Sequence, residues 1–235
     1  MIQKMVIPKV IFKIPSYEKV AQEIFNHVQF LKEKYNRVIY LNLPENLVKE
    51  IIGKNFLEIK EKIIEEVKKK HDIKKLENYK MGLKKYWNPL NKLFFENLKE
   101  IMRFDFKYKE YVVYITEIIR GMYSTENVVF TNPNEEVKKS GYIIAEEILH
   151  LHYWDIYRKI VKDVKCPWRD NERVWEFSET IPEFVLTDNL FERFSWGKNL
   201  NRKYLFIEKR KKELLPVWKD KKSFKDFMIK IHKTK

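Results

Sequence analysis

The stretch GYIIAEEILHLHYWDIY (141–157) decides the fold that we expect for this chain. Its apolar side chains fall all around a helical wheel, which is typical of a helix buried on every side. Glu146 lies four residues before His150 and Glu147 lies three before it, so these side chains are neighbours on the helix surface. Ionised carboxylates in such a place cost several kcal/mol each unless a metal ion, basic side chains or shared protons compensate them.

A second acidic cluster follows in VWEFSETIPEFVL (174–186), again among apolar residues. Glu176, Glu179 and Glu183 have the spacing i, i+3, i+7, which puts all three on one face if the segment is helical. Two consecutive apolar helices with inward carboxylates predict two walls of one polar site. A metal ion would hold these carboxylates together, and the alternative is an ion-pair network with basic partners such as Arg120, Arg158 and Arg173.

Pro182 sets the expected start of this second helix. Because proline lacks an N–H group, it is tolerated in the first turn, so we expect Ser178 to be the N-cap of a helix over about 178–194. Glu179 and Glu183 then stay one turn apart on one face, while Glu176 falls outside the helix.

The remaining elements are predicted from hydrophobic periodicity and from β-branched and aromatic content. The expected strands are 9–14, 37–43, 109–121 and 126–134, and the last two form an antiparallel hairpin with a turn over 121–125. The expected helices are 16–35, capped by Ser16, a largely helical region to about 104, a long helix over about 135–163, and a C-terminal helical region with breaks at Gly197 and Pro216.

This pattern predicts a mostly helical α+β fold, with a small antiparallel sheet packed beside the helix that carries the opening motif. We expect an N-terminal, mainly helical region over 1–104, a core over 105–197 and a basic helical extension over 198–235. One compact domain over the whole chain is the alternative.

The layout resembles that of gluzincin-type zinc metallopeptidases, including their small relatives called minigluzincins. In that family a strand hairpin precedes a helix with H-E-x-x-H, and a second helix supplies a further glutamate. Within AEEILHLHYW, Glu147 matches the catalytic glutamate and His150 matches the second histidine ligand. Glu179 resembles the third ligand and Glu183 the supporting carboxylate one turn later. The strand 126–134 lies where the family keeps the edge strand that pairs with an extended peptide.

One position departs from the family pattern, because Glu146 stands where the family has its first histidine. A glutamate binds zinc through oxygen, so a metal site is compatible with this exchange. The extra negative charge makes the metal centre less positive, and the oxygen-rich donor set favours harder ions such as Mn²⁺, Fe²⁺ or Mg²⁺ over Zn²⁺. His152 does not replace the missing ligand, since it lies about 200° around the helix from His150.

The resemblance implies a mechanism in which His150, Glu179 and Glu146 hold the metal ion. Glu147 takes a proton from the attacking water and passes it to the leaving amine. Three further side chains are candidates for stabilising the negative charge of the transition state: Tyr153, Tyr157 and Arg173.

Composition sets limits on the setting and the partners of the chain. It has 235 residues and a net charge of +14, and residues 198–235 carry +10 of that charge. Such a segment favours an anionic partner, although a solvated lysine-rich surface is the alternative. The single cysteine, Cys166, excludes an internal disulfide. With no long apolar run and no signal peptide, the sequence predicts a cytoplasmic protein without a membrane span.

Two functions follow from these features. The first is a metal-dependent hydrolase that acts on a peptide or protein. The second is a catalytically inactive zincin-like protein that serves as a binding module, for nucleic acid through its basic C-terminal region. A di-iron carboxylate bundle uses similar ligands but needs two E-x-x-H motifs, and only Glu147 and His150 form one here.

Overall fold

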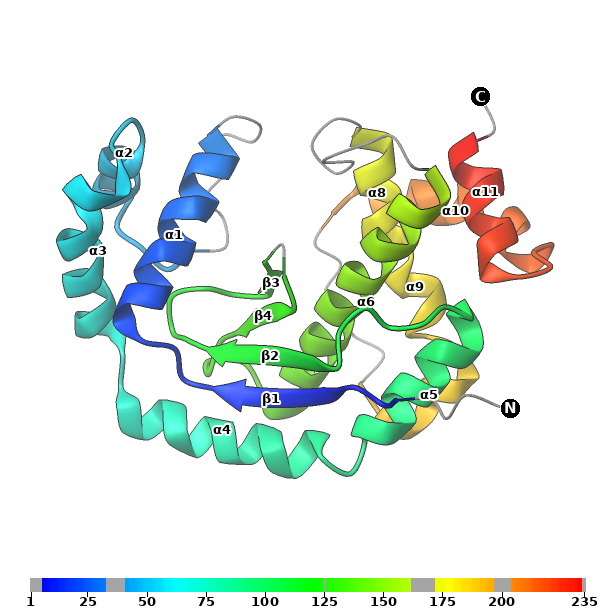
Figure 1. The fold of residues 1–235 in the computed structure, drawn as a ribbon, viewed down its shortest axis with the longest axis horizontal. Helices are drawn as coiled ribbons and strands as arrows, with labels where there is room; N and C mark the ends of the chain where they lie inside the picture. Colours follow the sequence, from blue (N-terminus) through cyan, green and yellow to red (C-terminus); the bar gives the residue numbers. More distant parts are fainter. Residues whose placement is uncertain (1–5, 33–40, 125, 162–171, 197–203, 234–235) are drawn as a thin grey trace.

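The computed structural model describes residues 6–32, 41–124, 126–161, 172–196 and 204–233 (Figure 1). The strands are β1 (Lys9–Lys13), β2 (Glu110–Ile115), β3 (Met122–Tyr123) and β4 (Val128–Thr131). The first helices are α1 (Tyr17–Lys32), α2 (Glu45–Ile51), α3 (Phe56–Lys70), α4 (Ile73–Trp87) and α5 (Asn91–Met102). The later ones are α6 (Val137–Val161), α8 (Glu172–Thr180), α9 (Pro182–Val185), the 3₁₀ helix η1 (Asn189–Phe194), α10 (Phe206–Lys219) and α11 (Phe224–Lys233). The predicted mostly helical α+β class is confirmed.

The sheet is mixed, with strand order β1-β2-β4-β3. β1 pairs with β2 and β2 pairs with β4 in parallel, with Ile115 opposite Thr131, and only β3 runs antiparallel to β4. The predicted antiparallel hairpin of 109–121 and 126–134 is therefore wrong. β-Branched content indicates strands but not their relative direction, and the residues read as a simple turn contain β3, which lets the chain return in parallel.

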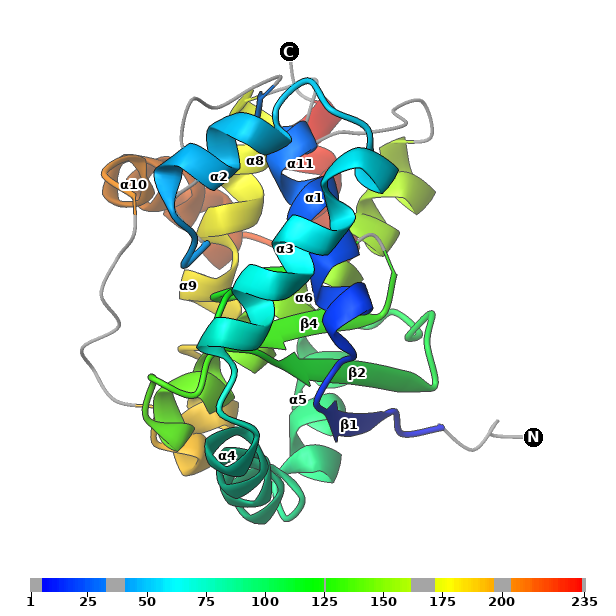
Figure 2. The same ribbon diagram turned by 90° about the vertical axis from the view of Figure 1, so that its left-hand side faces the viewer.

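The two faces of the sheet bury two separate hydrophobic clusters. Val112, Val128 and Phe130 face α1, α2 and α3, whereas Val113 and Val129 face α4, α5 and α6 (Figure 2). The second cluster continues through the C-terminal helices to Met228 on α11 and begins at Val10 on β1. Residues from all three sequence regions thus share one core.

The long helix α6 packs so closely against α4 that one position on it has no room for a side chain. A Cβ atom at Gly141 would lie 2.3 Å from Cε1 of Tyr86. The hydroxyl of Tyr86 donates to the carbonyl of Phe194 at 2.9 Å, which ties η1 to the same place. This close approach fixes where α6, and with it the opening motif, lies beside the sheet.

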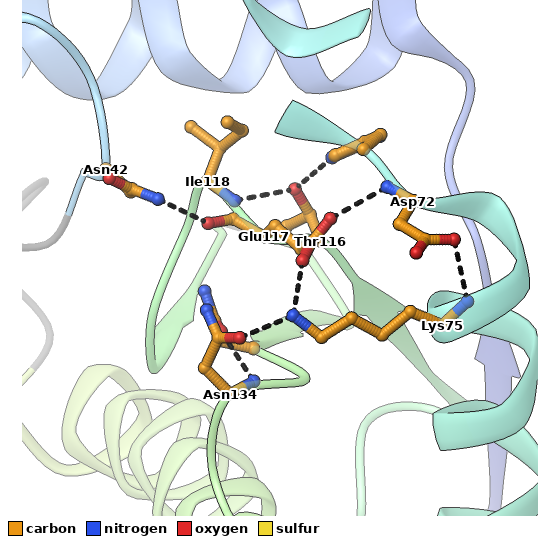
Figure 3. A network of polar contacts seen from close by, with 9 residues as sticks. Asn42, Asp72, Lys75, Thr116, Glu117, Ile118 and Asn134 are labelled. Atoms are coloured by element: carbon orange, nitrogen blue, oxygen red, sulfur yellow. Dashed lines mark hydrogen bonds and ion pairs between the residues drawn. The ribbon is translucent and has the colours of Figure 1, made fainter. Parts of the chain in front are cut away.

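A partly buried polar network closes the ends of β2 and β4 (Figure 3). The Glu117 carboxylate accepts the backbone N–H of Asp72 at 2.8 Å and the ammonium group of Lys75 at 2.6 Å. Lys75 also donates to Asn134 at 2.6 Å, and Nε2 of His71 lies 2.9 Å from the hydroxyl of Thr116. The network links the start of α4 to the segments that leave both strands.

Three local predictions have different outcomes. Ser16 caps α1 by accepting the N–H of Lys19 at 3.2 Å. The expected strand 37–43 falls largely on residues outside the described ranges, as does Gly197, while Leu41 forms an isolated antiparallel bridge with Ile119. The predicted break at Pro216 is wrong, because Pro216 lies inside α10, whose residues on both sides of it pack on the core.

Candidate functional site

α6 places the opening motif in the interior. The side chains of Glu147 and His150 are almost fully buried, at 5% and 3% exposure, while Glu146 is half-buried. The helix is buried around most of its circumference, as its apolar composition predicts. The structure therefore keeps the residues of the motif in an environment where ionisable groups are costly.

The second acidic segment meets this motif through one residue. Oε1 of Glu179 on α8 lies 3.8 Å from Nε2 of His150 on α6. The side chain of Glu179 is 18% exposed, so the contact lies at the boundary between the interior and the solvent. The structure thus brings together these two side chains, which the sequence assigned to two walls of one polar site.

The start of the second acidic helix differs from the prediction. α8 begins at Glu172 and already contains Glu176, and Ser178 lies within it rather than at its N-cap. The hydroxyl of Ser178 donates to the carbonyl of Trp175 at 2.7 Å. Pro182 does not begin one long helix. It is the first residue of the short helix α9, which follows α8. The missing N–H of proline is compatible with a new first turn, and the sequence does not show that another helix precedes it.

The negative charges of four carboxylates raise the pKa of one tyrosine, and these four carboxylates form the acidic cluster of the site. Burial raises the pKa of Tyr142 well above its usual value, and the negative charges of nearby carboxylates raise it further. These carboxylates are Glu146, Glu183, Glu147 and Glu179. All four acidic residues predicted for the site therefore share one electrostatic environment.

Basic side chains from α10 contact the acidic segment on its other side. Nζ of Lys211 lies 3.2 Å from Oε2 of Glu183, and Nε of Arg210 donates to Oε2 of Glu176 at 2.6 Å. The sequence had proposed Arg120, Arg158 and Arg173 as partners of the acidic clusters. Lys211 and Arg210 were missed because only the tertiary structure brings α10 against α8 and α9.

Tyr123 on β3 is a site residue that sequence reasoning missed. Its ring centre lies 5.7 Å from that of His150, and its hydroxyl accepts the indole N–H of Trp154 at 2.7 Å. Burial raises its pKa, and the charges of Glu179 and Glu147 raise it further, so the hydroxyl keeps its proton. The residue was assigned to a turn, and the only signal for a strand there is the pair Met122–Tyr123 after Gly121.

The edge of the sheet also differs from the expectation. β4, predicted to be the edge strand that pairs with a peptide, lies between β2 and β3. The strand at the end of the sheet beside α6 is the two-residue β3. The predicted position was wrong because the parallel pairing of β2 with β4 puts β4 inside the sheet.

The three candidates for stabilising the transition state lie elsewhere. The hydroxyl of Tyr153 lies 2.7 Å from Nε2 of His232 on α11, and the ring of Tyr157 packs edge-on against the same imidazole at 4.8 Å. Arg173 pairs with Glu213 on α10 at 2.6 Å. The structure groups these side chains with the C-terminal helices and not with His150 and Glu179.

His152 lies away from His150, as the helix geometry predicts. Its ring packs on Phe106 at 4.7 Å between centres, and in the described part of the chain neither ring nitrogen has a hydrogen-bond partner. Burial lowers its pKa to about 3. It is therefore a neutral histidine in the core.

The fit to a metal ion is partial. Zinc lies about 2.0–2.1 Å from nitrogen and about 2.0–2.2 Å from carboxylate oxygen, so two ligands of one ion are up to about 4 Å apart. His150 and Glu179 meet this condition at 3.8 Å. Among the residues that the structure describes, however, no three His, Cys, Asp or Glu side chains form a group placed to hold an ion. The third expected ligand, Glu146, is not brought to the pair.

Comparisons with family models, with curated proteins and with solved structures found no match to this chain. Within the described ranges, no helix has the length and apolar character needed to cross a bilayer. The site must therefore be interpreted from its own residues.

Proposed function

We propose that this protein is a metal-dependent hydrolase that acts on peptides. The proposal rests on one observation: His150 and Glu179, from two different helices, lie at the separation of two ligands of one ion, with Glu147 buried on the same helix as His150. We assign His150, Glu179 and Glu146 to the metal, with Glu183 as a supporting carboxylate. Glu146 would have to turn towards the pair when the ion, Zn²⁺ or the harder Mn²⁺ or Fe²⁺, binds.

The roles of the protein groups follow from their surroundings. A divalent ion at this place would polarise a peptide carbonyl and lower the pKa of water. The Glu147 carboxylate would accept the proton of the attacking water and deliver it to the leaving amine. Tyr123 keeps its proton and already accepts the N–H of Trp154, so its hydroxyl can donate to a developing oxyanion. Tyr123 replaces Tyr153, Tyr157 and Arg173 as our first candidate for this role.

Metal content and turnover test this proposal together. The purified full chain should bind about one divalent ion, and His150→Ala or Glu179→Ala should release it. Glu147→Gln should retain the ion and abolish the hydrolysis of a mixed peptide library. A chain that binds no divalent ion from Zn²⁺, Mn²⁺ or Fe²⁺ solutions would show that the site is not a metal centre.

A second candidate function is a catalytically inactive zincin-like binding module. It is favoured by the pairing of Glu183 with Lys211 and by the lack of a three-donor group within the described residues. Nucleic acid is the partner that its basic C-terminal region would suit, through a salt-dependent interaction. Because Arg210 and Lys211 pair internally, the test is Lys209→Ala with Lys212→Ala, which should weaken the binding of RNA or DNA without disturbing α8.

The setting of either function is also a proposal. The chain has a single cysteine, Cys166, which cannot form an internal disulfide. This composition supports a reducing compartment such as the cytoplasm.

A further inference from the structure

The basic helix α10 contacts the acid-bearing segment at two adjacent residues. Arg210 bonds to Glu176 on α8, and Lys211 bonds to Glu183 on α9. Glu179 lies between these two glutamates in the sequence, three residues after the first and four before the second. The two ion pairs therefore bracket the residue that meets His150.

The pair at Arg210 belongs to a chain of alternating charges. The guanidinium of Arg210 bonds to Glu176 at 2.6 Å and to Glu213 at 2.5 Å, and Glu213 also accepts Arg173 of α8 at 2.6 Å. Burial raises the pKa of Glu213, but the hydrogen bonds from the two arginines outweigh it and leave that pKa lowered. α8 and α10 are thus joined by two ion pairs. The acidic residue is on α8 in the first pair and on α10 in the second.

The part of this network at Arg210 and Glu176 is shielded from solvent and backed by an aromatic ring, whereas Arg173 is exposed. The side chains of Arg210 and Glu176 are 17% and 13% exposed, and that of Glu183 is 11% exposed. Both guanidinium groups lie over the ring of Phe177, at 5.2 Å for Arg173 and 5.6 Å for Arg210. Such pairs hold a more defined geometry than exposed lysine–glutamate pairs do.

We propose that Arg210 and Lys211 are positioning residues that hold Glu179 opposite His150. α8 has only nine residues, and its orientation towards α6 depends on what lies behind it. α10 packs on α8 on the side of Glu176, so it sets how far α8 and its Glu179 reach towards α6. This inference rests on the proposed function, since the juxtaposition matters for chemistry only if the two side chains share a ligand. It gives part of the basic C-terminal region a role inside the molecule.

A variant that completes the ligand set makes the test independent of the native activity. In the full chain with Glu146→His, the donors become two histidines and Glu179, and zinc affinity reports how well His150 and Glu179 are held together. Adding Arg210→Glu should weaken zinc binding about 10- to 100-fold, the range observed for outer-shell partners of metal ligands. The further change Glu176→Lys, which restores an opposite pair, should recover most of the affinity.

Lys209→Ala is the matched control, because Lys209 is the exposed neighbour of Arg210 on α10. It should leave the zinc affinity of the Glu146→His chain unchanged, and thermal melts of all variants identify any loss that reflects unfolding. Zinc affinity that stays the same with Arg210→Glu, or that is lost without recovery by Glu176→Lys in a folded chain, would overturn the inference. A Glu146→His chain that binds no zinc would also overturn it. If that variant binds zinc but the unaltered chain binds no metal, the proposed function is refuted and the inference about Arg210 is not.

Discussion

Two partly buried polar clusters in this molecule are built in different ways. Around Glu117, a carboxylate receives a backbone N–H and a lysine ammonium at hydrogen-bond distance (Figure 3). Around His150, the facing group is the Glu179 carboxylate at 3.8 Å, and four carboxylates act on the same tyrosine. The first cluster centres on one carboxylate with its donors, whereas the second brings several carboxylates close together, with Lys211 bonded to one of them.

The difference supports a structural role for the first cluster and is consistent with the function that we propose for the second. A satisfied network holds elements together, so it contributes to the stability of the fold. The second cluster holds two buried tyrosines whose pKa values are raised by burial and by nearby carboxylates, and perturbed ionisable groups of this kind concentrate at functional sites. Substitutions in the two clusters should therefore have opposite consequences for stability and activity.

The largest effect is expected at Glu147, which is buried on α6. Glu147→Gln should lower the rate of hydrolysis by about 10²- to 10⁴-fold, because the general base is lost while the shape is kept. Its melting temperature should change little, because the amide has nearly the same shape as the carboxylate. A strong fall in melting temperature would place Glu147 with the structural networks and contradict the contrast between the clusters.

The next effect concerns the structural cluster. Glu117→Ala should destabilise the fold by about 2–3 kcal/mol, because it leaves the N–H of Asp72 without its acceptor and removes one of the two acceptors of Lys75. At this chain length that corresponds to about 4–12 °C in melting temperature. Glu77→Ala, in an exposed pair with Lys80, is the control and should change stability by less than about 0.5 kcal/mol. Equal effects of the two substitutions would refute the structural role of the network.

A third effect is the dependence of stability on pH that arises from His152 of α6. Burial lowers the pKa of His152 to about 3; Lys99 and Lys159 also lower it, and Asp155 and Asp105 partly oppose this. Above pH 6.5 the ring is neutral in both states. Below that pH the unfolded chain takes up a proton that the folded chain does not, so stability falls from pH 6.5 towards pH 3.

At pH 5 this difference in proton uptake at His152 lowers the free energy of unfolding by about 2 kcal/mol. His152→Phe should therefore make the decline of stability between pH 7 and pH 5 shallower by about that amount, as measured by urea unfolding at both pH values. His27 and His232, whose pKa values burial lowers to about 4 and about 3, keep part of the slope. An unchanged slope would mean that His152 gains a proton in the folded protein.

The smallest effect is expected at Tyr123. Tyr123→Phe should lower kcat about tenfold with little change in KM, because the hydroxyl acts only on the developing negative charge. Tyr157→Phe removes a hydroxyl from the cluster around His232 and provides the contrast. If Tyr157→Phe lowered kcat and Tyr123→Phe did not, the sequence-based choice of Tyr157 would be restored.

Much of the local structure could be predicted from the chain. Strong periodicity places the helix around residues 141–157 and the strand at 9–14, and a short polar residue marks the cap at Ser16. The direction of β2 relative to β4 could not be predicted, because alternation specifies which face is buried and not which neighbour is paired. β3 is too short to produce a pattern at all.

The candidate site likewise has a part that the sequence predicts and a part that it does not. Spacing along one helix places Glu146, Glu147 and His150, and a second acidic cluster indicates a facing wall that contains Glu179. The position of Tyr123, the pairing of Arg210 with Glu176 and the location of Tyr153 beside His232 depend on contacts between segments far apart in the chain. The spacing of residues along one helix does not predict contacts between segments that are far apart in the sequence.

By itself, the sequence determined the buried motif helix and the residues that it carries, since helix periodicity and the cost of burying charge are local properties of the chain. Only the tertiary structure decided which of these residues meet. It brought Glu179 to His150 and left Glu146 out of that pair, and it set α10 behind α8. The reason is physical: a side-chain contact between helices depends on how their backbones pack, and packing is a property of the whole core.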